Sequence, residues 1–154
     1  MNKQDRELLV ISLFGYFPYK CMVRVEKEYH EEVYEEFFGY SVEPYDSVLN
    51  LIMLEQLFFS TDENYVIKPY LRPLSSMTDE ENIELSKRYV FDIVGNKISI
   101  RYHCEGYWDD DTECPTSEYI WLIDWLLKHH FDYRGLIDMG LALPAPEGMY
   151  NFNN

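Results

Sequence analysis

The first third of the chain changes from a helical to a strand pattern of apolar residues. Leu8, Ile11 and Phe14, with Leu9 and Leu13 beside them, recur at helical spacing, which predicts a helix over residues 3–17. Apolar and polar residues then alternate over residues 20–28, as they do in a strand that is buried on one face. The start of the chain therefore predicts a helix followed by a strand.

Three further apolar stretches are interpreted as strands. Residues 31–46 fit either a helix or a strand, but their aromatic and β-branched content and the presence of Gly39 favour a strand. Residues 47–53 predict a buried strand, and residues 54–60 predict another. Together with residues 20–28, these stretches predict a small antiparallel sheet.

A proline-containing stretch, residues 68–77, follows the predicted sheet. Pro69 and Pro73 each lack a backbone N–H and restrict the residue before them, so we expect an extended connector without regular structure. Thr78 is followed three residues later by Glu81, which is the spacing of a capping box. A helix is therefore predicted to begin at this point.

The part of the chain after this helix begins with a predicted β-hairpin. Residues 89–94 and 97–103 are rich in β-branched and aromatic residues, and Gly95 and Asn96 lie between them. A two-residue turn of this composition is favoured in hairpins. Residues 105–115 are acidic and show no periodicity, which predicts a loop.

The end of the chain predicts two helices and an extended tail. Residues 118–130 carry an apolar face so broad that we expect the helix to be buried on two sides. A short helix is predicted over residues 134–139, ended by Gly140. Residues 143–154 follow as an extended segment.

These elements predict an α+β fold in which an N-terminal helix, a small antiparallel sheet, a β-hairpin and C-terminal helices share one core. A length of 154 residues fits a single domain. We divide it into a strand-rich half over residues 1–67, a connector over 68–77, and a helix and hairpin half over 78–154.

Two long stretches of sequence resemble a known family. They are KPYLRPLSSMT at residues 68–78 and WLLKHHFDYRGLI at residues 125–137, with further matching segments at 140–143 and 145–150. They are similar to small proteins of gut Bacteroidales, their phages and their mobile elements. The resemblance carries no activity with it, and it implies only the setting of a phage or mobile element.

The charge of the chain narrows the classes of partner. Twenty-eight acidic and thirteen basic residues give a net charge of −15. Direct binding of nucleic acid needs an excess of Lys and Arg, and an anionic membrane would repel such a chain, so we expect neither. The charge serves solubility or the recognition of a protein partner with a basic surface. The acidic candidates for such recognition are Glu31, Glu32, Glu35, Glu36, Asp109, Asp110 and Asp111.

The cysteines and the chain start predict a reduced, cytoplasmic protein. The first residues lack the pattern of a signal peptide, no apolar run is long enough for a membrane span, and the three Cys form an odd number. His103, Cys104 and Cys114 flank an acidic run, but their spacing differs from that of zinc sites. We therefore expect no metal and no cofactor.

Two groups of residues are candidates for chemistry or contact. His129, His130 and Asp132 fit a metal or catalytic site, but neighbouring residues on a helix point about 100° apart, so we favour a structural role at the helix end. Lys68, Tyr70 and Arg72 fit a small cationic and aromatic contact site. In the alternative that we favour, the two cations pair with nearby carboxylates and have a structural role.

The function that these observations predict is non-catalytic. No nucleophile motif and no glycine-rich phosphate loop occurs in the sequence. We expect an accessory protein of a phage or mobile element that acts by binding another protein. One alternative is an acidic mimic of nucleic acid that inhibits a host defence or DNA-processing protein. The other alternative is a small enzyme that uses His129, His130 and Asp132.

Overall fold

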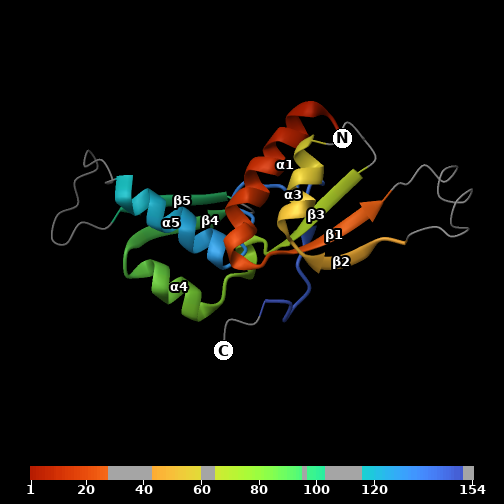
Figure 1. Cartoon of the computed structure of the whole chain (residues 1–154). Helices are drawn as coiled ribbons and strands as arrows, with labels where there is room; N and C mark the ends of the chain where they lie inside the picture. The colour runs from red at the N-terminus through yellow and green to blue at the C-terminus, as the bar shows by residue number, and fades with distance from the viewer. Residues whose placement is uncertain (28–42, 60–64, 95–96, 103–115, 151–154) are drawn as a thin grey trace, which may run out of the picture.

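The computed structural model describes residues 1–27, 43–59, 65–94, 97–102 and 116–150. Its elements are α1 Lys3–Tyr16, η1 Phe17–Tyr19, β1 Met22–Lys27, β2 Tyr45–Val48, α3 Leu51–Phe59, β3 Tyr65–Leu71, η2 Leu74–Ser76, α4 Asp79–Ser86, β4 Tyr89–Val94, β5 Lys97–Tyr102, α5 Thr116–Lys128 and β6 Leu143–Pro144. They form the α+β fold that the sequence predicts (Figure 1).

A four-stranded sheet with the strand order β2-β1-β3-β6 supports the first part of the fold. Strand β1 runs antiparallel to both β2 and β3, and the short β6 runs parallel to β3. One face of the sheet buries Val23, Val25, Ile67 and Leu71 completely, and these side chains pack in the same cluster as α1 and α3. Figure 1 shows both helices on this side of the sheet.

A second apolar cluster holds α4, α5 and the segments next to them together. Buried side chains of α4 and α5 meet there with Leu74 and Phe131. Strands β4 and β5 form a separate two-stranded sheet, which lies on the same side of the molecule as α4 and α5 in Figure 1. Gly15 of α1 faces Leu127 of α5, and a Cβ at Gly15 would lie 3.1 Å from that side chain. The two helices therefore approach closely where the clusters meet.

The prediction that the prolines prevent regular structure in the connector is wrong, because β3 continues through Pro69 to Leu71. The Leu71 carbonyl accepts a hydrogen bond from Ala145, on the side of β3 that faces away from β1. Backbone groups alternate between the two sides of a strand, so the Pro69 nitrogen also faces away from β1. Pro69 therefore takes its place opposite Val23 without removing a bond between the strands.

The two strands predicted over residues 47–53 and 54–60 are also wrong. Residues up to Val48 belong to β2, and the helix α3 follows. The Asn50 side chain accepts a hydrogen bond from the Met53 N–H at 3.0 Å, as a residue that caps a helix does. Leu, Met, Glu and Gln dominate this segment and favour a helix, but an apolar run of this length shows no clear period.

Two predicted helices exist but expose side chains that were expected inside. In α1, Leu9 and Leu13 of the predicted apolar pattern are buried, whereas Ile11 and Phe14 are more than half exposed, so the buried face is rotated toward Leu9 and Leu13. Helix α5 buries Leu122, Trp125 and Leu126 on one side and leaves Tyr119, Ile120 and Ile123 exposed, so burial on two sides is wrong. Residues 134–139 form turns in place of the predicted helix.

Two local predictions are confirmed. Strands β4 and β5 pair antiparallel with Val94 opposite Lys97, as the hairpin requires, while Gly95 and Asn96 themselves lie outside the described residues. Helix α4 begins after Thr78. Most of the strand predicted over residues 31–46, and the loop over 105–115, also lie outside the described residues. Among the helices that the structure describes, none has the length and apolar character to cross a membrane.

Candidate functional site

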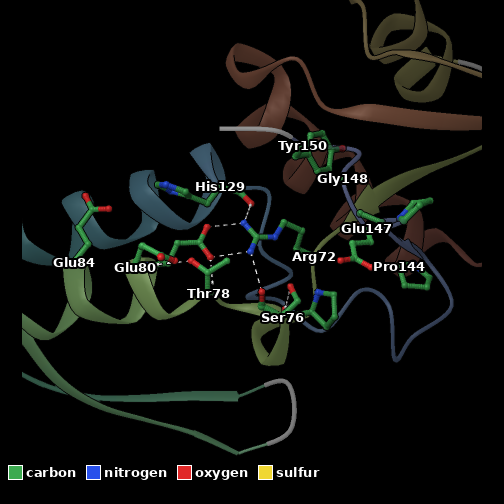
Figure 2. Close-up of a pocket in the computed structure, with 14 residues that line it drawn as sticks. Arg72, Ser76, Thr78, Glu80, Glu84, His129, Pro144, Glu147, Gly148 and Tyr150 are labelled. Carbon is green, nitrogen blue, oxygen red and sulfur yellow. Dashed lines mark hydrogen bonds and ion pairs between the residues drawn. The ribbon is translucent and has the colours of Figure 1, made fainter. Parts of the chain in front are cut away.

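A groove of about 970 Å³ lies between α4 and the segment that follows β6 (Figure 2). One wall comes from the turn before α4 and from α4 itself, and includes Glu80 and Glu84. Residues 144–148 and Tyr150 form the opposite wall. Arg72, directly after β3, lies between the two walls. The groove therefore joins segments that are far apart in the sequence.

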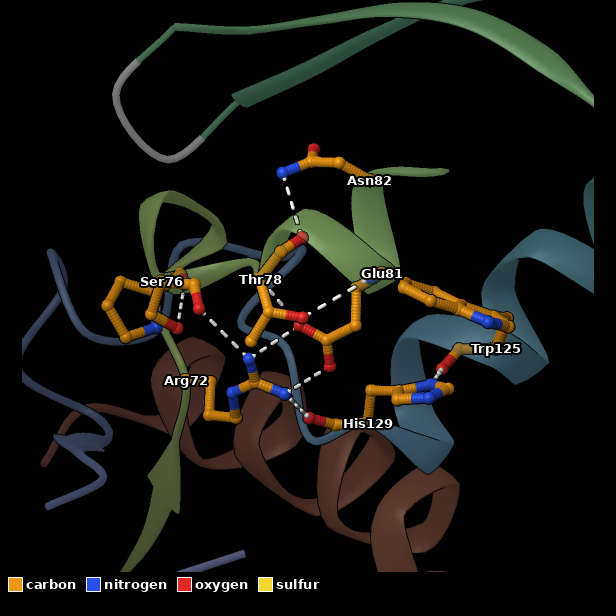
Figure 3. Close-up of polar contacts among 8 residues, drawn as sticks. Arg72, Ser76, Thr78, Glu81, Asn82, Trp125 and His129 are labelled. Carbon is orange, nitrogen blue, oxygen red and sulfur yellow. Dashed lines mark hydrogen bonds and ion pairs between the residues drawn. The ribbon is translucent and has the colours of Figure 1, made fainter. Parts of the chain in front are cut away.

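Arg72 is bound to Glu81 through two parallel hydrogen bonds (Figure 3). The Nη1–Oε1 distance is 2.6 Å and the Nη2–Oε2 distance is 2.8 Å. Nη2 also donates to the Ser76 carbonyl at 3.0 Å, and the guanidinium lies over the Phe131 ring, 4.3 Å from its centre. A planar guanidinium can bind a carboxylate through two hydrogen bonds and stack on an aromatic ring at the same time. Arg72 therefore fixes the end of β3 against α4.

Glu81 also completes the cap of α4. Its Oε2 accepts a hydrogen bond from the Thr78 N–H at 2.8 Å, and the Thr78 hydroxyl accepts one from the Glu81 N–H at 3.3 Å. This is the capping box that the sequence predicts. The same carboxylate thus starts the helix and binds Arg72.

The charge state of Glu81 follows from these contacts. Burial opposes the charged form, but the hydrogen bonds from Arg72 and from the Thr78 backbone outweigh it and hold the pKa of Glu81 below its usual range. Glu81 is therefore ionised at neutral pH and neutralises Arg72. Because Arg72 is the one Lys or Arg among the described residues that line the groove, its walls keep an excess of negative charge.

That negative charge comes from Glu80 and Glu84 on α4 and from Glu147 on the opposite wall. All three residues are exposed, and none forms an ion pair with another described residue. Carboxylates that line a concave surface strengthen one another's potential there. The groove is thus suited to a cationic group.

The second wall is fixed to the sheet at two points. The Ala145 N–H donates to the Leu71 carbonyl at 2.8 Å, which extends the pairing of β3 with β6. The Tyr150 hydroxyl accepts from the Met22 N–H at 2.9 Å and donates to the Tyr70 carbonyl at 2.8 Å. One hydroxyl therefore ties the wall to both β1 and β3.

The two histidines make structural contacts at the end of α5. The Nδ1 atom of His129 lies 2.8 Å from the Trp125 carbonyl one turn earlier. His130 has a positive φ of 58°, and its Nε2 lies 2.8 Å from the Tyr19 carbonyl. Its ring stacks on that of Tyr150 with 3.7 Å between ring centres. Burial lowers the pKa of His130 to about 4, so its ring is neutral at pH 7.

Asp132 is completely buried and stabilises a turn. Its carboxylate accepts hydrogen bonds from the N–H groups of Leu136 and Ile137, each at 2.8 Å. Each of the three candidates, His129, His130 and Asp132, thus contacts backbone groups at a different place. All three therefore make contacts with the backbone, although the specific partners, Tyr19 for His130 and Leu136 and Ile137 for Asp132, were not predicted.

Lys68, Tyr70 and Arg72 each contact a carboxylate of their own. Lys68 Nζ lies 3.2 Å from the Glu26 carboxylate, and the Tyr70 hydroxyl donates to Asp46 at 3.0 Å. Arg72 faces α4 through Glu81. The pairing of the two cations with nearby carboxylates is therefore confirmed, and their role in contacting a partner stays a prediction.

Nucleophilic and metal chemistry receive no support from the described residues. Burial raises the pKa of the Cys21 thiol to about 12, so it is not a thiolate at neutral pH. Within the described ranges, no group of three or more His, Cys, Asp and Glu is placed to hold a metal ion.

The predicted acidic surfaces, Glu31, Glu32, Glu35 and Glu36 together with Asp109, Asp110 and Asp111, lie outside the described residues. The mimicry hypothesis that rests on them stays a prediction.

Sequence reasoning missed the three carboxylates of the groove, Glu80, Glu84 and Glu147. The first two have the i, i+4 spacing of one helix face, which was visible in the sequence. Only the fold places Glu147 opposite them.

A comparison of the chain with protein-family models, with curated proteins and with solved structures found no match.

Proposed function

We propose that this chain is a non-catalytic accessory protein of a phage or mobile element, and that its groove binds a basic side chain or segment of another protein. The observation that carries the proposal is the pairing of Arg72 with Glu81. It neutralises the one Lys or Arg among the described lining residues and leaves Glu80, Glu84 and Glu147 on facing walls. A Lys or Arg side chain of a partner could approach carboxylates from both sides.

The resemblance noted above supports the choice of this groove. The segments 68–78, 125–137 and 145–150, which resemble the phage and mobile-element family, together contribute most of its lining residues. They include Arg72 at its base and Tyr150 in its wall. Segments of that resemblance thus meet at one place in the fold.

Exposed apolar side chains support a protein as the partner. Helices α1, α3 and α5 carry large apolar residues that are at least two-fifths exposed: Ile11, Phe14, Leu51, Ile52, Phe58, Phe59, Tyr119, Ile120 and Ile123. Single exposed apolar residues are common on protein surfaces, whereas larger groups of them often mark contacts between proteins. These helices therefore offer apolar surface for contact with a protein, apart from the groove itself.

The proposal is tested by titrating a short oligolysine peptide into the wild-type chain and two matched variants. The groove variant carries Glu80→Gln, Glu84→Gln and Glu147→Gln. The control variant carries Glu7→Gln, Glu55→Gln and Asp138→Asn, which removes the same charge from exposed positions outside the groove lining. Isothermal titration calorimetry at physiological salt measures each affinity.

We expect the groove variant to bind the peptide at least about tenfold more weakly than the control, because it loses three exposed ion pairs of up to about 1 kcal/mol each, and tenfold in affinity is about 1.4 kcal/mol. Equal affinities of the two variants would contradict the proposal, since binding would then follow net charge alone. The same pair applies to partner capture from host lysate. A protein retained by the control and lost by the groove variant is the expected result.

A further inference from the structure

The Tyr150 hydroxyl occupies the place of a missing backbone hydrogen bond between β1 and β3. The described pairing of the two strands ends with Val23 opposite Pro69, so Met22 and Tyr70 come next in register. Backbone groups alternate along each strand, and the Met22 N–H and Tyr70 C=O both face the space between β1 and β3. Met22 and Tyr70 are not among the paired residues of the two strands, and each of these groups is hydrogen-bonded to the Tyr150 hydroxyl instead.

This geometry gives the strands two ways to satisfy the same backbone groups. With Tyr150 in place, the N–H and the carbonyl are joined through its hydroxyl. Without Tyr150, a small approach of the strands lets the Met22 N–H bond the Tyr70 carbonyl directly and extends the antiparallel pairing by one residue pair. Removal of Tyr150 therefore leaves no orphaned backbone group, which is the usual cost of opening a buried contact.

We propose that residues 143–150 are a releasable wall of the groove, locked by the Tyr150 hydroxyl, and that release of the wall is coupled to closure of the Met22–Tyr70 pair. Beyond β6 itself, the backbone hydrogen bonds that tie the described part of this segment to the sheet include that of Ala145 to Leu71 and those of the Tyr150 hydroxyl, and the Tyr150 ring also stacks on His130. Pro144 and Pro146 lack an N–H, so they add no backbone donor to hold the segment. A short attachment of this kind opens at lower free energy than the core.

The wall and the groove ligand influence each other by linkage. Glu147 belongs to the releasable wall, whereas Glu80 and Glu84 belong to α4. A cationic group that contacts both walls binds the locked state better than the released state, so it shifts the population toward the locked state. This coupling rests on the proposed function, whereas the two-state wall itself does not.

The test is amide hydrogen exchange of the wild-type chain and of the Tyr150→Phe variant, each without and with oligolysine peptide. In the variant, the Ala145 amide should exchange at least about tenfold faster than in the wild type, as its attachment opens. The Met22 amide should stay protected, because it now bonds the Tyr70 carbonyl. The Leu13 amide, in the buried core of α1, reports global unfolding and should not change.

An unchanged rate for Ala145 would overturn the lock, and loss of protection at Met22 together with Ala145 would overturn the closure. If the variant unfolds, the wild-type chain in low denaturant decides the question. There the proposal requires Ala145 to exchange through an opening that leaves Met22 and Leu13 protected, and simultaneous exposure of all three contradicts it.

The coupling to the ligand has its own test: oligolysine should slow exchange at Ala145 in the wild type. Bound peptide without this slowing would refute the coupling alone, whereas failure of the peptide to bind would refute the proposed function and leave the lock standing.

Discussion

Arg72 and Glu81 join the end of β3 to the first turn of α4 through two hydrogen bonds of 2.6 and 2.8 Å. Their side chains are only 13% and 11% exposed. The pair therefore links the four-stranded sheet to α4 at the base of the groove. It also determines the charge of the groove, because it neutralises Arg72.

Removal of one member of this pair should be costly. We predict that Arg72→Ala lowers the free energy of unfolding by about 3–5 kcal/mol, because it leaves the Glu81 charge largely buried without its partner. Lys3→Ala is the matched control, since it breaks a pair with Glu7 whose side chains are 89% and 63% exposed. That change should cost at most about 1 kcal/mol. Equal losses in urea unfolding would show that the Arg72 pair has no special weight.

The cap of α4 provides a second test of the same region. Thr78→Ala removes the hydroxyl that accepts the Glu81 N–H and should destabilise the chain by about 1 kcal/mol. Thr78→Ser keeps the hydroxyl and should behave as the wild type does. The unfolding midpoint of both variants measures the difference. A midpoint for Thr78→Ala that equals that of Thr78→Ser would disprove the capping role.

The buried ring of His130 should make stability depend on pH. Its pKa is about 4 in the folded chain against an ordinary value of 6.5, so the unfolded chain takes up the proton first as pH falls. The stabilisation is complete above about pH 6.5 and is lost as pH falls toward 4, by up to about 3 kcal/mol. Glu81, whose pKa is also lowered, adds a further loss in the range in which carboxylates titrate.

The variant His130→Asn isolates this contribution, because Asn tolerates the positive φ of 58° and does not titrate. Its free energy of unfolding should fall less steeply between pH 6.5 and pH 4 than that of the wild type. Chemical denaturation at a series of pH values measures both slopes. Parallel slopes would show that His130 is not the source of the dependence.

The features that sequence alone predicted are those fixed by neighbouring residues. The cap at Thr78 and Glu81 depends on a three-residue spacing, and the hairpin depends on a two-residue turn between alternating strands. The first helix was also found, but its apolar face was rotated. Its apolar residues cover most of its circumference, so the side that packs is chosen by β1, β3 and α3.

The features that sequence missed depend on distant partners. The strand β3 tolerates Pro69 because its nitrogen faces away from β1, which no local pattern reveals. The groove needs Glu147 to lie opposite Glu80 and Glu84, and the Tyr150 hydroxyl holds that wall in place. Such long-range placement is a property of the whole fold, whereas turn and cap chemistry is local.

Binding of a cation in the groove can be observed directly by locating oligolysine on the folded chain. Oligolysine is titrated into ¹⁵N-labelled wild-type protein and followed by two-dimensional NMR, with the same peptide acetylated on every lysine as the neutral control. We predict that shift changes concentrate at the amides of Glu80, Glu84, Ala145 and residues 147–150, and that the acetylated peptide, which lacks the charges, produces none. Changes that lie elsewhere, or that spread evenly over the acidic surface, would contradict it.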